Sequence, residues 1–382
     1  MRFGDENATD KHKNNSDYKQ GFSFDKKSPV KHPKVIFCEN NDLSYFQNGG
    51  GVHCGGRRKR LVLPCWYCAN FRHQAPLQKS FHSPHASILA IFMSLPVALI
   101  TGASTGIGLE TTLALAAHGY RVYAGIRNMD NAPKMLALAD ERGYKDNIHP
   151  VKLDVLNVNE TTLTVRRIMT EESRIDVLIN NAGQGMVRSI EQATMKEIHD
   201  LFDLNFMGNI RLLRQVIPIM RQQGGGRIIA VSSVGGLVGQ PMNEVYCASK
   251  FALEGLYESM ATYFKPYFNI DITLIEPGAV ATEFVNTVMK NIQATGGFKD
   301  DAYKPVLDDY LRKRQERASS GASQTQTPAD IAAVILRCVQ DPTPPLRIRT
   351  SDGGEQFCAL KTSADPDGTT LQQQIRSLML GK

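Results

Sequence analysis

Val97-Ala-Leu-Ile-Thr-Gly-Ala-Ser-Thr-Gly-Ile-Gly108 is the segment from which the fold of this chain is best predicted. Its apolar start, residues 97–100, predicts a buried β-strand. Glycines follow in the spacing T-G-x-x-x-G-x-G, and residues 109–118 then carry helix-forming side chains ahead of Gly119, a helix C-cap. A strand, a glycine turn and a helix in this order form the βα unit typical of dinucleotide-binding folds.

The glycine turn predicts a phosphate site. Glycines allow a tight turn and a close approach of the backbone, and the helix N-terminus offers free N–H groups and the positive end of its dipole. The alternative is a purely structural turn. The residues that we expect to line the cofactor here are Gly102, Ser104, Thr105, Gly106, Ile107 and Gly108.

A second predicted strand, residues 121–126, ends at Arg127. An acidic residue at this position would accept the ribose 2′-hydroxyl of NAD, whereas a guanidinium suits a 2′-phosphate and can bind it with two hydrogen bonds. With Ser104 as a second donor, the sequence favours NADP(H) over NAD(H). In the alternative reading Arg127 is a solvated loop residue and Asp130 meets the ribose.

Tyr246 and Lys250 are four residues apart in a predicted helix near residues 244–265, so both side chains lie on one face. A fixed ammonium beside a phenol favours the phenolate, and we therefore expect Lys250 to lower the pKa of Tyr246 toward neutral pH. Such a phenol can exchange a proton with a carbonyl or an alcohol. By itself this spacing is also common among solvated residues.

Strand-like and helical segments alternate along the rest of the chain, which predicts a doubly wound parallel α/β sheet of the Rossmann type. The expected strands are residues 97–100, 121–126, 151–153, 176–180, 227–231, 270–275 and 346–349. A long helix is expected near 194–222 and a terminal helix near 370–380. Right-handed crossovers would bring the glycine turn, the loop at residues 181–183 and Tyr246 to the carboxyl edge of the sheet.

Residues 279–326 form a long insert with two predicted helices, 284–292 and 303–317, separated by Gly296-Gly297. We expect a mobile helical lid over the substrate, with glycine hinges. Ordinary helix packing is the equal alternative for its apolar residues, which are Phe284, Val285, Val288, Met289 and Phe298.

Together these motifs resemble the short-chain dehydrogenase/reductase family over roughly residues 94–350. Five motifs match in order: residues 101–108; Asp154; Asn180-Asn-Ala-Gly183; Ser233 with Tyr246 and Lys250; and Pro277-Gly278 with Thr282. The segments Val234-Gly-Gly-Leu and Asn243-Glu-Val-Tyr-Cys-Ala-Ser-Lys-Phe-Ala-Leu-Glu-Gly-Leu256 are most similar to the branch that includes estradiol 17β-dehydrogenase type 1 and photoreceptor retinol dehydrogenase.

The resemblance implies a catalytic role for four residues. Tyr246 would be the acid/base, and Lys250 would bind the nicotinamide ribose and lower the pKa of the tyrosine. Ser233 would hydrogen-bond the substrate oxygen; Ser232 is its rival, but the spacing of thirteen residues to Tyr246 favours Ser233. Asn205 would hold a water that relays protons to Lys250, or would be merely a polar residue of a helix.

The resemblance also implies further cofactor contacts. Asn181, Ala182 and Gly183 would border the cofactor, and Asp154 would lie by the adenine. Pro277 and Gly278 would shape the nicotinamide pocket or simply form a turn. Thr282 would bond the carboxamide or a phosphate.

Residues 1–92 differ from the rest in composition. They carry 14 Lys and Arg against 7 Asp and Glu, while the whole chain is +6, so the remainder is close to neutral and shows no electrostatic footprint for nucleic acid. We expect a disordered basic leader, with Met93 as the working start of a single oxidoreductase domain, 93–382. Less favoured readings are a zinc site at Cys65 and Cys68 with neighbouring histidines, a basic targeting patch at residues 57–60, and a transit peptide.

We therefore expect an NADP(H)-dependent alcohol dehydrogenase or carbonyl reductase that acts on a lipophilic small molecule, similar to a steroid or a retinoid. The alternatives are a 3-oxoacyl thioester reductase and a non-catalytic NADP(H)-binding regulator. No metal site is assigned. The seven cysteines show no disulfide framework, which favours a reducing, cytoplasmic compartment. A homodimer is expected from the family alone, and association with a membrane surface stays open.

Overall fold

The computed structural model describes residues 95–319 and 325–380. Several predictions therefore lie outside the described residues: the disordered leader, the start at Met93, the zinc ligands around Cys65 and Cys68, and the basic patch at residues 57–60.

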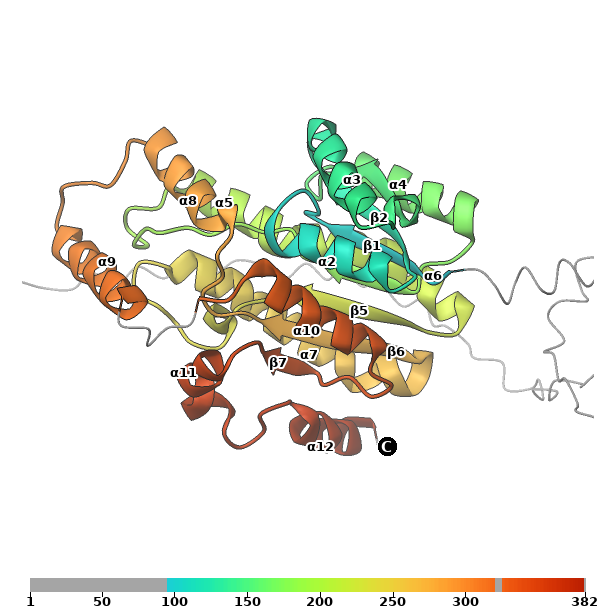
Figure 1. Cartoon of the computed structure of the whole chain (residues 1–382). Helices are drawn as coiled ribbons and strands as arrows, with labels where there is room; N and C mark the ends of the chain where they lie inside the picture. The colour runs from blue at the N-terminus through green and yellow to red at the C-terminus, as the bar shows by residue number, and fades with distance from the viewer. Residues whose placement is uncertain (1–94, 320–324, 381–382) are drawn as a thin grey trace, which may run out of the picture. The chain divides into compact units, whose positions relative to one another are not determined.

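Seven parallel strands form one sheet in the order β3-β2-β1-β4-β5-β6-β7 (Figure 1). The order reverses between β1 and β4, and this switch point is where ligands bind in sheets of this kind. The doubly wound parallel sheet is thus confirmed. The strands are β1 (Val97–Thr101), β2 (Arg121–Ile126), β3 (Ile148–Lys152), β4 (Val177–Asn180), β5 (Gly226–Val231), β6 (Ile270–Glu276) and β7 (Arg347–Arg349).

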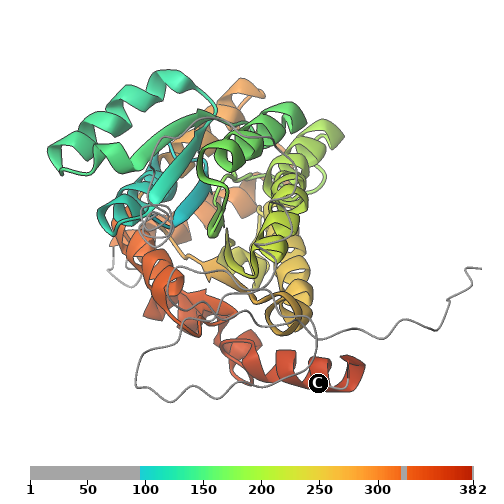
Figure 2. The ribbon, with the colours of Figure 1, turned by 90° about the vertical axis from the view of Figure 1, so that its right-hand side faces the viewer.

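Helices cover both faces of the sheet (Figure 2). Neighbouring residues of a strand point to opposite faces, so Val97 and Leu99 join one apolar core, and Ala98 and Ile100 join the other. Both faces of β1 are fully buried, which explains why its sequence is a continuous apolar run. The first core packs on α4 (Val158–Glu172), α6 (Gly208–Gln223) and α7 (Glu244–Phe268), and the second on α2 (Gly106–Ala117), α3 (Ala132–Glu141) and α10 (Pro328–Gln340).

Strand β3 begins at Ile148, three residues before the predicted start. Pro150 argued against a strand here, because proline has no backbone N–H with which to donate a hydrogen bond to a neighbouring strand. It is tolerated here because β3 is an edge strand.

The long helix expected near residues 194–222 is interrupted. It consists of α5 (Met195–Phe202), a π-helical turn (Asp203–Met207) and α6. Thr194 and Glu197 form a capping box at its start. The π turn inserts one extra residue into the helical repeat, and such turns are frequent at functional sites.

The insert between β6 and α10 contains α8 (Glu283–Ala294) and α9 (Lys304–Ser319). It leaves and rejoins the body of the protein at one place, because Val280 and Gln326 form an isolated parallel bridge. The Ala281 N–H donates to the Gln326 carbonyl at 2.9 Å, and the Gln326 N–H donates to the Ala279 carbonyl at 3.0 Å.

Two helices follow β7: α11 (Asp352–Thr362) and α12 (Thr369–Leu380). Helix α11 was not predicted from the sequence, since Gly353 and Gly354 stand in its first turn and glycine disfavours helices. Ser351 compensates by capping the helix through the Gly354 N–H at 3.1 Å. Among the described helices, none combines the length and the hydropathy needed to cross a membrane.

Candidate active site

The loops after β1 and β4 are joined by hydrogen bonds at the carboxyl edge of the sheet. The Thr101 hydroxyl accepts the N–H groups of Asn181 at 3.0 Å and Ala182 at 2.9 Å, and the Asn181 amide donates to the Thr101 carbonyl at 2.8 Å. Asn181 therefore holds the glycine turn in place from the neighbouring strand.

The glycine turn is open in a way that fits a dinucleotide. Gly102 and Gly106 have φ values of +65° and +56°, which residues with a side chain rarely adopt. A Cβ on Gly108 would lie 2.2 Å from the Gly102 carbonyl oxygen, so only glycine fits. Thr105 stands at the N-cap of α2 without capping it through its side chain, and this leaves the N–H groups of Gly106, Ile107 and Gly108 available to a phosphate.

Arg127 is exposed at the end of β2, beside the glycine turn of the neighbouring strand. Its carbonyl accepts a hydrogen bond from Lys152 Nζ at the end of β3, which adds a second cation to this edge. Asp130 is exposed in the following turn.

Asp154 is half-buried after β3, and its carboxylate accepts the Leu156 N–H at 3.0 Å. This side chain thus shapes the loop that we expected to lie by the adenine.

Tyr246 and Lys250 lie on one face of α7, and Ser233 faces them from the loop after β5. Ser233 caps a short 3₁₀ turn (Val234–Gly236) by accepting the Gly235 N–H at 3.0 Å. Its hydroxyl also hydrogen-bonds Tyr246, whereas the neighbouring Ser232 is buried beside Glu254. Of the two serines, Ser233 is therefore the one placed beside the phenol.

The expected lowering of the Tyr246 pKa toward neutral pH is wrong for this structure. Burial raises the pKa of Tyr246 to about 12, and the hydrogen bond with Ser233 opposes this shift only in part. Lys250 Nζ lies 5.9 Å from the centroid of the Tyr246 ring and donates to the Val231 carbonyl at 2.9 Å. Burial lowers the pKa of Lys250 to about 8, while the charge of Glu254 opposes that shift. Desolvation is thus the largest influence on the pKa of both groups.

Asn205 is fully buried in the π turn, and its side chain is held by three hydrogen bonds. Its oxygen accepts the Gln184 N–H at 2.9 Å, and its amide donates to the Gln184 carbonyl at 2.9 Å and to Ser249 Oγ at 3.0 Å. A Cβ on Gly183 would lie 3.2 Å from Asn205 Oδ1 and 3.6 Å from Lys250 Nζ. Asn205, Gly183 and Lys250 therefore border the same small space.

The loop after β6 forms the opposite wall. The Pro277 carbonyl accepts the Val234 N–H at 3.0 Å, and Ser233 Oγ lies 3.5 Å from the same oxygen. Gly278 follows it, half-buried. Thr282 caps α8 through the Phe284 N–H at 3.2 Å, and its methyl carbon lies 3.2 Å from the position of a Cβ on Gly106. Thr282 thus connects the lid to the glycine turn.

The insert at residues 279–326, which we expected to be a lid and call the lid below, reaches the candidate acid through Phe284. A Cβ on Gly185 would lie 2.7 Å from the Phe284 ring and 3.0 Å from a methyl of Val288, so Gly185 makes room for α8. The sequence analysis did not single out Gly185, because a lone glycine in a loop carries no distinctive signal.

Arg188 was also missed, and it holds the glycine pair at which the lid was expected to hinge. Its guanidinium is only 4% exposed and donates to Thr295 Oγ1 at 2.7 Å and to the Gly297 carbonyl at 3.4 Å. Gly296 and Gly297 have φ values of +94° and +76°, consistent with a turn that only glycine adopts easily. A basic residue in a loop is usually solvated, so its sequence gave no sign of this contact.

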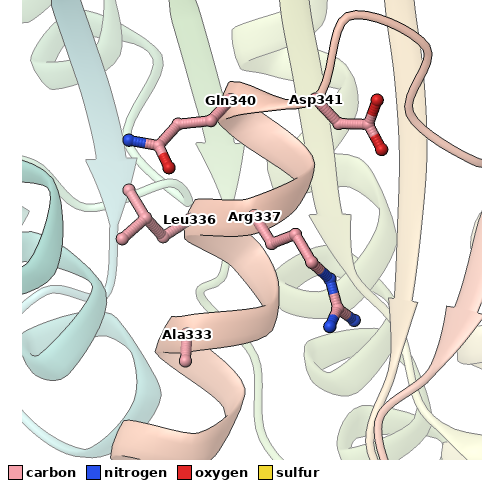
Figure 3. A pocket seen from close by; sticks show the side chains of 5 residues that line it. All are labelled: Ala333, Leu336, Arg337, Gln340 and Asp341. Atoms are coloured by element: carbon pink, nitrogen blue, oxygen red, sulfur yellow. The ribbon is translucent and has the colours of Figure 1, made fainter.

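A hollow along α10, shown in Figure 3, contains none of the candidate residues. It lies at the carboxyl end of α10, and a crossover helix runs antiparallel to the strands, so this end faces the edge of the sheet opposite to Tyr246. The hollow is lined by Ala333, Leu336, Arg337, Gln340 and Asp341.

The fold and these residues define a short-chain dehydrogenase, and the chain belongs to that family: the family model described as short chain dehydrogenase matches residues 96–293. The chain is 37% identical to bovine retinol dehydrogenase 8 over 71% of its length and 86% of the relative. It is 35% identical to rat estradiol 17-beta-dehydrogenase 1, over 73% of this chain and 80% of the relative.

A solved structure of a short-chain dehydrogenase from Streptomyces avermitilis has the same fold. It is 26% identical, with a TM-score of 0.58, and the match covers 75% of this chain and 98% of that chain. The protein is therefore an oxidoreductase that acts on alcohol or carbonyl groups of small molecules with a nicotinamide cofactor.

Proposed function

We propose that the protein is an NADP(H)-dependent oxidoreductase that reduces the carbonyl group of a lipophilic molecule of steroid- or retinoid-like size, with Tyr246 as the proton donor. The observation that carries this proposal is the position of Tyr246. Its phenol has the Ser233 hydroxyl on one side, while the Phe284 ring of the lid contacts its own ring. A hydroxyl that can bind a substrate oxygen and an apolar ring that can contact a lipophilic substrate thus meet at Tyr246.

The glycine turn and the N-terminus of α2 would hold the pyrophosphate, and Asn181, Ala182 and Gly183 would border the cofactor. When bound, the nicotinamide supplies or accepts the hydride. Arg127 and Ser104 would bind the 2′-phosphate, and Asp154 would face the adenine. Their arrangement at the ends of neighbouring strands supports NADP(H) over NAD(H).

The chemistry of the chain itself is proton transfer and charge stabilisation. Tyr246 would donate its proton to the carbonyl oxygen of the substrate, and Ser233 would stabilise the charge that develops there. The raised pKa of Tyr246 keeps the proton on its phenol, which suits a reduction. Lys250 would bind the ribose. Asn205 would hold a water that relays a proton to Lys250 after Tyr246 has given up its own.

Apolar residues of the lid support a lipophilic substrate. Val288 is 6% exposed behind Phe284, and Gly185 leaves the space in which both pack. The names of the relatives refer to retinol and estradiol, which are both lipophilic alcohols. Pro277, Gly278 and Thr282 would close the nicotinamide side of this pocket.

A 3-oxoacyl thioester reductase would use the same four catalytic residues and differ only in the lid. A non-catalytic regulator would bind NADP(H) without turnover. The complete set of Asn205, Ser233, Tyr246 and Lys250 argues against the regulator, since a protein that only binds the cofactor has no use for a proton donor.

The deciding experiment is a panel of steroid ketones, retinal and 3-oxoacyl thioesters, tested on the full chain with NADPH and with NADH. We expect NADPH-dependent reduction of a steroid ketone or of retinal. Turnover of thioesters alone would establish the alternative enzyme. Tight NADPH binding without turnover of any substrate would contradict the enzymatic proposal.

We further propose a homodimer that associates through α6 and α7, and a cytoplasmic location. Partly exposed apolar side chains on α7, such as Phe251 and Tyr263, support the dimer. Sedimentation of the full chain at several concentrations tests it, and a concentration-independent monomer would contradict it. Fractionation of cells that express the tagged chain tests the location.

A further inference from the structure

A buried group of acidic residues lies behind Lys250, outside the machinery described above. Glu254 is one helical turn beyond Lys250 on α7, so the two side chains share a face. Glu276 ends β6 and is fully buried, and Glu254 is only 7% exposed. Carboxylates are rarely buried unless they are paired, and this pair therefore requires an explanation.

The two carboxyl groups face each other. Burial raises both pKa values, that of Glu276 to about 9; the charge of Glu254 raises the pKa of Glu276 further, whereas the contact with Glu276 lowers the pKa of Glu254. Among the residues that the structure describes, neither oxygen of Glu254 nor Oε1 of Glu276 has a donor of good geometry when both groups are ionised. Two carboxylates cannot donate to each other, so the contact is satisfied only if one of them carries a proton.

The cations near the pair are also bound by other carboxylates. Arg349 Nη1 lies 3.2 Å from Glu276 Oε2, but this guanidinium also binds Glu355 at 2.7 Å and 3.0 Å. Arg347 is paired with Glu258. The titratable and charged groups that face the pair are Lys250 and Glu258 on α7, Arg347 and Arg349 on β7, and Glu355 and Cys358 on α11.

Ser232 and Gly236 fix Glu254 from the loop that also carries Ser233. A Cβ on Gly236 would lie 2.8 Å from Ser232 Oγ and 3.1 Å from Glu254 Oε1. Glycine is thus needed here for the carboxyl group to pack against the loop. The acid pair and the proposed proton donor are therefore supported by the same short segment.

We propose that Glu254 and Glu276 share one proton, and that the single negative charge of this pair is a positioning element that keeps the buried ammonium of Lys250 charged. The inference deepens the proposed function, because it concerns the lysine beside Tyr246. A buried ammonium that donates only to a carbonyl would otherwise lose its proton near neutral pH.

The proposal predicts opposite effects of two isosteric substitutions. In Glu254→Gln the remaining charge is confined to Glu276, and Lys250 loses the one carboxylate whose charge raises its pKa, so Lys250 should lose its proton about one pH unit lower than in the parent. In Glu276→Gln the new amide donates to Glu254 and fixes the charge there, so Lys250 should lose its proton at a higher pH.

The measurement is the ¹³C NMR titration of Cε-labelled lysine in the free protein, with Lys250→Met to assign the resonance. Glu244→Gln, an exposed position at the start of α7, is the control and should leave the titration unchanged. Shifts of the same sign in both variants, or no shift in either, would overturn the proposal. This readout needs no substrate, so it separates the acid pair from a failure of the proposed reaction.

A second measurement needs no variant of the pair. Infrared spectra of the parent protein should retain the C=O band of a protonated, buried carboxylic acid at pH 7, where ordinary glutamates are ionised. The absence of that band would show that both carboxyl groups are charged, and the shared proton would be disproved.

Discussion

The ring of Phe284 lies 6.0 Å from the ring of Tyr246, measured between centroids, with their planes at 64°. This edge-on contact joins the lid helix α8 to the candidate acid on α7. Phe284 is still 38% exposed, so part of its ring is available to a ligand. The lid and the proposed proton donor thus meet at a ring that is partly open to solvent.

Phe284→Ala should raise KM for a lipophilic ketone about tenfold, because the substrate loses an apolar contact of about 1.4 kcal/mol. The value of kcat should change much less, since Tyr246 and Ser233 stay in place. Steady-state kinetics measure both constants. Phe357→Ala removes a similarly exposed phenylalanine on α11 and should leave them unchanged. An unaltered KM in the lid variant would place the substrate elsewhere.

Tyr246→Phe should lower kcat by at least about 100-fold, because it removes the proposed proton donor. Binding of NADPH, measured by quenching of protein fluorescence, should stay within about twofold, since the ring and its packing are retained. Tyr263→Phe, on the exposed side of the same helix, is the matched control. Residual turnover near the parent rate would assign the proton transfer to another group.

Arg127→Asp should weaken NADPH by at least about 100-fold and NADH hardly at all, because a carboxylate repels the 2′-phosphate. Lys134→Asp, an exposed position on α3, makes the same change of charge and should affect both cofactors only slightly. Dissociation constants for the two cofactors, measured by titration calorimetry, decide the matter. Equal affinities in the parent protein would exclude the assignment.

Two glycine-to-alanine substitutions should have different effects, one on NADPH binding and the other on the stability of the fold. Gly108→Ala forces a Cβ within 2.2 Å of a backbone oxygen, so the glycine turn has to move and NADPH binding should be lost. Gly255→Ala adds a Cβ in open space on α7 and should stabilise the fold by about 0.5–1 kcal/mol. Thermal unfolding with and without NADPH measures both. A Gly108→Ala protein with normal cofactor affinity would contradict the description of the turn.

The stability conferred by Glu276 should decline as the pH rises. Its pKa is raised to about 9 in the folded protein, against 4.5 for an ordinary glutamate, so the folded state binds the extra proton between these values. The free energy of unfolding of the parent, relative to Glu276→Gln, should therefore fall from pH 5 to pH 9. Urea unfolding at several pH values tests the sign. A difference that increases with pH would show that Glu276 is ionised when folded.

The fold was predicted from sequence because its signals are local. The apolar run of β1 and the glycine turn define the first βα unit, and the remaining strands follow the same pattern. Predictions failed where tertiary position overrides propensity: Pro150 is tolerated only because β3 is an edge strand, and α11 forms despite Gly353 and Gly354.

The candidate site was predicted only in part. The family resemblance predicted Asn205, Ser233 and Tyr246 as candidates, but the contacts of Gly185 and Arg188 depend on how the lid folds back, which no local pattern encodes. The pKa of Tyr246 was expected to fall but is raised, because burial cannot be read from the spacing of Tyr246 and Lys250. Glu254 was overlooked for the same reason, since a glutamate in a helix is usually solvated.

The paired backbone at Val280 and Gln326 has a consequence for engineering. Because the two ends of residues 281–325 are already held together, this segment could be exchanged for the equivalent piece of another reductase without altering the sheet or the glycine turn. Chimaeras cut at this bridge would carry over a foreign choice of substrate as one module, while the hydride-transfer centre of the host is retained.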